Sequence, residues 1–129
     1  MYAELDCPWD WVRVGIIWFG AGLDVLIRVD DPVEEPCFHI VDYRAGKFDI
    51  SVSLTEPKCL RPHTEARLTD EAKQALDAFM HSVPKQRYFE THYEQAVFLW
   101  NDQNPHGARV TTAKDASGNV IIPDYSTLN

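Results

Sequence analysis

The sequence predicts an α+β fold: a four-stranded antiparallel meander covered on one face by two helices, with a short C-terminal hairpin. Three observations indicate this class. Apolar and polar residues alternate through much of the first 54 positions, two apolar stripes at helical spacing follow, and short links join the alternating segments. Because short links connect antiparallel neighbours, we expect a meander rather than parallel strands with crossovers.

The stretch from Cys37 to Leu54 is the clearest strand pair, with its turn at 44–47. From Phe48 to Leu54 the second arm alternates apolar with polar residues, as a half-buried strand requires. We therefore expect a sheet with one buried face and one solvated face, and the later helices are expected to cover the buried one.

Two further strands precede this pair, Trp11–Phe19 and Leu23–Asp30, and a glycine-containing turn joins them. The first is apolar on both faces, which indicates a central or doubly covered strand. On it we expect one face to carry alternate residues: Val12, Val14, Ile16 and Trp18. The proline-containing segment Asp31–Pro36 ends the second strand, since proline donates no ladder hydrogen bond.

Residues 55–67 carry two prolines and no periodicity, which predicts a loop. Thr69 and Thr91 are the expected N-caps of two helices, whose apolar stripes run over 72–83 and 93–100. Segments 109–113 and 120–122 flank a turn and predict the C-terminal hairpin. Together these elements form a single domain, residues 1–129.

The chain is acidic, with 12 Lys and Arg against 20 Asp and Glu and a net charge of −8. This balance argues against direct nucleic-acid binding, which needs clustered basic residues, and favours a basic protein partner. Solubility alone is the simpler explanation of the same charge. The apolar runs are too short for a membrane span. The three cysteines lack metal-ligand spacing and indicate reduced thiols of a cytoplasmic protein.

The sequence supplies no nucleophile elbow, phosphate loop or zinc-protease motif, so we assign no catalytic residue, metal ligand or cofactor from it. We interpret His39 as a solvated or loop histidine. Cys37 shares its strand face but is expected to act as a small buried hydrophobe. The alternative is a small metal-dependent hydrolase that uses His39, Asp42 and His63.

Acidic residues and tryptophans suggest a contact surface. The candidate partner-binding residues are Trp9, Trp11, Asp30, Asp31, Glu34 and Glu35. The leading hypothesis is a non-enzymatic inhibitor of a basic protein partner, of the antitoxin, immunity-protein or phage counter-defence type. A plain solvated loop with an N-terminal flap over the sheet remains open, as does a homo-oligomer joined through an uncovered sheet face.

Three short segments carry a resemblance: Pro36–Ile40, Trp100–Pro105 and Pro123–Tyr125. They resemble a group of small uncharacterised bacterial proteins with a His-Phe-His strand, a Trp-Asn-x-x-Asn-Pro helix end and a Pro-Asp-Tyr tail. A shorter domain-of-unknown-function family, sometimes found beside toxin–antitoxin cassettes, is similar in its hairpin-then-helix order. Cys37 stands where the pattern has its first histidine. The resemblance implies a mobile-element or defence setting and brings no activity with it.

Overall fold

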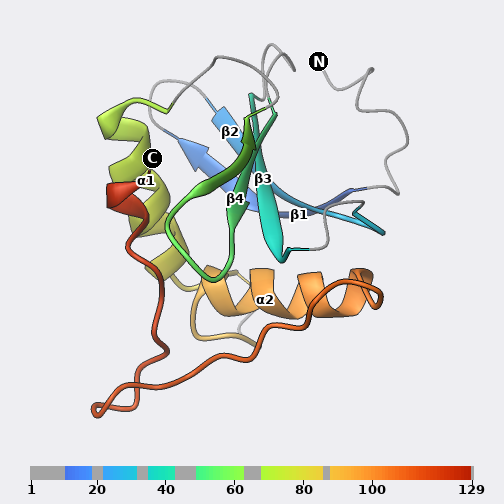
Figure 1. Ribbon diagram of the computed structural model, residues 1–129. Coiled ribbons are helices and arrows are strands. Elements are labelled where there is room, and N and C mark those ends of the chain that lie inside the picture. Colours follow the sequence, from blue (N-terminus) through green and yellow to red (C-terminus); the bar gives the residue numbers. More distant parts are fainter. Residues whose placement is uncertain are drawn as a thin grey trace.

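A computed structural model describes residues 11–18, 22–31, 35–42, 49–62, 68–85 and 88–128. It confirms the α+β class, but within these residues the antiparallel sheet has five strands rather than four, in the order β1-β2-β3-β4-β5 (Figure 1). The elements are β1 (Trp11–Trp18), β2 (Gly22–Arg28), β3 (Cys37–Asp42), β4 (Asp49–Ser53), β5 (Cys59–Pro62), α1 (Asp70–His81), α2 (His92–Gln103) and the 3-10 turn η3 (Tyr125–Thr127). The predicted turns at 20–22 and 44–47 fall largely or wholly outside the described residues.

The fifth strand corrects the prediction of a loop over residues 55–67. β5 pairs with β4 within this segment, with Arg61 opposite Ser51 and Pro62 opposite Ile50. It lies at the sheet edge, where a proline that donates no ladder hydrogen bond is tolerated. Because the register is irregular after Ser51 and the strand is short, the sequence shows no alternation of apolar and polar residues there.

A β-bulge in β1 corrects the predicted facing of that strand. The register shifts between Arg13 and Gly15, so Val12 and Gly15 lie opposite Ile27 and Val25 respectively. Beyond the bulge the alternation changes parity, and Ile16 and Trp18 do not continue the face of Val12. Val14, at the bulge itself, is buried in the main core. Gly15 thereby faces the helices: a Cβ on it would lie 2.6 Å from the Phe79 ring of α1. This position needs glycine for the close approach of α1 to the sheet.

Both helices begin at the predicted N-caps. The side chain of Thr69 accepts a hydrogen bond from the backbone N–H of Ala72, and that of Thr91 accepts one from the backbone N–H of Glu94. The helices pack on the sheet face that carries Phe38 and Ile40, and the chain returns after α2 to place η3 against α1 (Figure 1). There the Tyr125 ring meets Phe38 edge-on. Within the described part of the chain, neither helix has the length and apolar character to cross a membrane.

The opposite sheet face is also buried, which makes the prediction of a solvated face wrong. Strand register places His39 between Leu26 and Ser51, on the other side of β3 from Ile40. Leu26, His39, Ser51 and Ser53 are each at most 7% exposed. Polar residues at alternate positions therefore mark a second interior face, not a wet one.

The predicted C-terminal hairpin is reduced to a single bridge between Lys114 and Val120. Asp115 closes the turn between them, since its carboxylate accepts hydrogen bonds from the backbone of Ser117 and Asn119. Residues 109–113 do not form a strand. The turn chemistry was readable from the sequence, but the flanking residues are too exposed to hold a ladder.

Candidate functional site

Three polar side chains from two segments meet on this second face of the sheet. Nε2 of His39 lies 2.6 Å from Oδ2 of Asp31 and 3.9 Å from Sγ of Cys37. The thiol sulfur lies 3.6 Å from the same carboxylate oxygen. The side chains of Asp31 and His39 are 1% and 2% exposed, and Cys37 is fully buried. We call these three residues the Asp-Cys-His cluster.

The backbone explains how the cluster forms. Cys37 and His39 are two residues apart on β3, so their side chains leave the strand on one face. Asp31 comes from the turn that follows β2, where Asp30 has a left-handed φ of 50°. Aspartate tolerates the left-handed conformation better than most residues, and this conformation at Asp30 reverses the direction of the chain. The turn after β2 thus places a carboxylate beside the adjacent strand, β3.

Two neighbours fix the histidine ring. Ser51 sits directly opposite His39 on β4, and its hydroxyl oxygen lies 3.4 Å from Nδ1. Trp11 meets the imidazole edge-on, with ring centroids 5.1 Å apart and planes at 90°. Both ring nitrogens therefore have a polar neighbour, and one side of the ring has an aromatic one.

The electrostatics of Cys37 argue against a cysteine nucleophile. Burial is the largest influence and raises the pKa of the thiol, and the nearby Asp31 carboxylate raises it further. A hydrogen bond and the charge of His39 act in the opposite direction but do not prevail. The thiol therefore stays protonated, whereas nucleophilic cysteines are partly exposed and have a lowered pKa.

The donor set fits a transition-metal ion. One ligand atom from each residue of the cluster lies within 4.8 Å of the other two. Bonds of about 2.0–2.3 Å to a tetrahedral ion would place such donors roughly 3.3–3.7 Å apart. The sulfur–oxygen distance of 3.6 Å already meets this range, and the sulfur–nitrogen distance of 3.9 Å nearly does. Only the 2.6 Å contact between His39 and Asp31 has to open, by about 0.7 Å on the same bond lengths.

The structure differs from the sequence-based expectation for His39 and confirms it for the burial of Cys37. The interpretation of His39 as a solvated histidine is wrong, because it is buried and paired. Burial of Cys37 is confirmed, although its sulfur contacts polar groups. His63 and the side chain of Asp42 lie outside the described residues, and strand parity puts position 42 on the other face from position 39.

The predicted contact surface is divided. Asp30 and Glu35 are exposed, Trp11 is half-buried, and the Asp31 carboxylate points inward to His39. Trp9 and Glu34 lie outside the described residues. The sequence did hold a signal for the cluster, an acidic turn followed by Cys-x-His on an alternating strand. That signal indicates only the cysteine and the histidine, because nothing within the acidic turn distinguishes Asp31 from its acidic neighbours.

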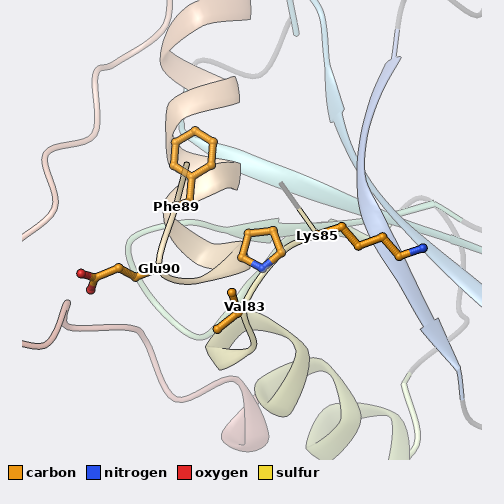
Figure 2. A pocket seen from close by; sticks show the side chains of 5 residues that line it. Val83, Lys85, Phe89 and Glu90 are labelled. Carbon is orange, nitrogen blue, oxygen red and sulfur yellow. The ribbon is translucent and has the colours of Figure 1, made fainter. Parts of the chain in front are cut away.

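A second feature is an open hollow between the end of α1 and the start of α2. Pro84 is one of its lining residues, and Figure 2 shows Val83 beside α1 and Phe89 near α2. The two charged side chains, Lys85 and Glu90, extend in opposite directions and do not converge on a common point (Figure 2). The hollow therefore lacks the convergent polar groups that mark a ligand site.

Comparisons with known proteins add no independent line of evidence on the site. The resemblance to small bacterial proteins accordingly stays a prediction. The chain matches no protein family, no curated protein and no solved structure.

Proposed function

We propose that the chain is a metal-binding protein whose Asp-Cys-His cluster takes a zinc ion or a similar transition metal. The observation that carries this proposal is the convergence of a sulfur, a nitrogen and an oxygen donor at one buried point. Thiolate, imidazole and carboxylate are the three side-chain ligands that zinc uses. A structural ion pair between Asp31 and His39 alone would not require the thiol of Cys37.

Burial favours a structural or sensing role over turnover. Three protein ligands and one open position are also the pattern of catalytic zinc sites, as a hydrolase would need. The donors here are at most 2% exposed, so a substrate would have no direct approach to the ion. Ion binding would therefore act mainly on the stability of the sheet, since an ion that binds only the folded state stabilises it.

Titration with Zn²⁺ and Co²⁺ tests the proposal. We expect one ion per chain, with a thiolate-to-cobalt charge-transfer absorption when Co²⁺ binds. Cys37→Ser should abolish that absorption, and Asp31→Asn and His39→Gln should weaken binding strongly. Cys59→Ser is the matched control, because Cys59 is a second cysteine, on β5, and does not belong to the cluster. Absence of binding, or equal binding by the two serine variants, would overturn the proposal.

An acidic surface for a basic protein partner is the second candidate function, in a cytoplasmic inhibitor of the antitoxin or immunity type. The exposure of Asp30 and Glu35 supports it. Asp30→Asn combined with Glu35→Gln should weaken capture of such a partner, and capture should weaken with added salt. The same neutralisation at Asp70 and Glu71, which are exposed on α1, serves as the control. Equal effects of both double variants would refute this surface.

A further inference from the structure

Asn104, at the end of α2, holds the turn that supplies Asp31. It is buried, with 4% exposure, and its amide makes two hydrogen bonds to the turn. Its Oδ1 accepts a 2.6 Å bond from the backbone N–H of Asp31, and its Nδ2 donates a 2.9 Å bond to the carbonyl of Arg28. Beside it, the backbone N–H of Asp30 donates to the carbonyl of Gln103 at 3.1 Å. The end of α2 therefore makes hydrogen bonds to the turn at Arg28, Asp30 and Asp31.

These hydrogen bonds are important for the geometry of the cluster, because Asp31 is its one residue that does not lie on a strand. His39 is paired with β2 and with β4, and Cys37 is paired with β4, whereas Asp31 follows a left-handed residue in a turn. A metal site needs its donors within about 0.5 Å of the productive geometry, and sites on turns reach this only when other groups lock them. The side-chain amide of Asn104 offers an acceptor oxygen and an NH2 donor group, which match the N–H of Asp31 and the carbonyl of Arg28.

A second series of contacts runs from the same amide back to the cluster. Arg28, whose carbonyl binds Asn104, places its guanidinium over the Trp11 ring at 5.7 Å from the centroid. Trp11 in turn meets the edge of His39. The Asn104 amide is thus linked to His39 by two routes, one through Asp31 and one through Arg28 and Trp11.

We infer that Asn104 is a positioning residue for the metal site, and that ion binding is coupled to the C-terminal end of α2. The inference rests on the metal-binding function proposed above. Because coupling between two equilibria is reciprocal, whatever loosens the helix end weakens ion binding, and a bound ion steadies the helix end. Asn104 touches neither the ion nor its donor atoms and acts through the backbone of Asp31.

The chain supplies a matched control in Asn101, one turn earlier on α2. Its side chain also makes two hydrogen bonds to backbone, both to Val110 at 2.9 Å, and neither reaches the Asp31 turn. Asn104→Ala and Asn101→Ala thus each remove two side chain–backbone hydrogen bonds from the same helix. Unfolding by urea in the presence of a chelator measures their structural costs, which we expect to be similar.

The zinc affinity of each variant, measured by competition with a chromophoric chelator, separates the two roles. We expect Asn104→Ala to bind zinc about 10–100-fold more weakly than the native chain, the range typical of lost outer-shell partners. Asn101→Ala should bind with native affinity. Asn104→Asp keeps the acceptor for the Asp31 N–H and loses the donor to the Arg28 carbonyl. Its zinc affinity should therefore lie between those of the native chain and Asn104→Ala. If Asn104→Ala fails to fold, Asn104→Asp takes its place in the comparison.

Hydrogen exchange gives a second readout of the coupling. Zinc should slow exchange of the Asp31 and Asn104 amides in the native chain and in Asn101→Ala, but much less in Asn104→Ala. Failure of the native chain to bind zinc would remove the proposed function and this inference together. Zinc binding with equal affinities for the two alanine variants would leave the metal site standing and overturn the role of Asn104.

Discussion

The buried pair of Asp31 and His39 gives the most direct stability prediction, made with a chelator present so that no ion takes part. Alanine at either position leaves the other side chain buried without its 2.6 Å partner. Removing one member of a buried pair typically costs about 3–5 kcal/mol, because a desolvated polar group remains. Since the Cys37 thiol still neighbours each of them, we take about 3 kcal/mol for each single variant.

The chain length converts this cost into a melting shift. At about 2.1 cal/mol/K of unfolding entropy per residue, 129 residues give about 0.27 kcal/mol/K. A loss of 3 kcal/mol therefore lowers Tm by about 11 °C. The double variant lacks both members of the pair, so neither is left buried without the other, and it should cost well below the sum of the two single variants. The expected coupling energy is about 2 kcal/mol.

Urea unfolding followed by tryptophan fluorescence measures the cycle, with Trp100 as a fully buried reporter. The control is the pair Lys58–Glu56, whose side chains are 48% and 60% exposed and whose cycle should show no measurable coupling. Additive costs for Asp31 and His39, with coupling below about 0.5 kcal/mol, would show that the pair does not act as a unit and would refute this account.

Three further predictions concern the packing of the helices. Gly15→Ala should destabilise the fold by about 1–3 kcal/mol in urea unfolding, because its Cβ would lie 2.6 Å from the Phe79 ring, and Phe79→Leu should relieve part of the loss. Burial lowers the pKa of His92 below its ordinary 6.5. As the pH falls, this histidine is therefore protonated in the unfolded state before it is protonated in the folded state. Stability should therefore fall as pH drops below about 6.5, and His92→Gln should flatten that slope in urea midpoints measured against pH. Tyr125→Phe should cost about 1–2 kcal/mol in the same assay, since the buried Ser53 carbonyl loses its 2.8 Å donor, and an unchanged midpoint would contradict this.

Local signals accounted for the part of the fold that sequence reasoning found. Thr69 and Thr91 cap their helices as predicted, because the capping hydrogen bond depends on residues within one turn. The errors occur where regular alternation is broken. The bulge before Gly15 and the short edge strand β5 each add an irregularity that a period of two does not describe.

The site was predictable only in its local half. Parity alone put Cys37 and His39 on one face of β3, and the structure confirms that they share it. The assignment of Asp31 depends on an interaction 73 residues away in sequence, the hydrogen bond to Asn104. No pattern within the acidic turn separates the inward Asp31 from the exposed Asp30. The difference arises from tertiary contacts with the end of α2.

Cys37 provides the test that separates a structural cluster from a functional one. The same sheet face also carries Leu26 and Val41, both buried and apolar. A valine at position 37 would fit the same environment without a sulfur beside a carboxylate, and replacing buried polar groups by apolar ones of similar volume is often neutral or stabilising. We therefore expect Cys37→Val to unfold in urea plus chelator at the native midpoint or above it.

The same variant should lose the stabilisation that zinc gives the native chain, about 2.7 kcal/mol at a free ion concentration of 100 Kd. A valine variant that is already unstable with chelator present would show instead that the thiol is needed for packing. Stability that survives while the response to zinc disappears would mean that the sulfur serves the ion and not the fold. A polar donor that the fold itself does not need, held at van der Waals range from two others, is what ligation requires and what core packing does not.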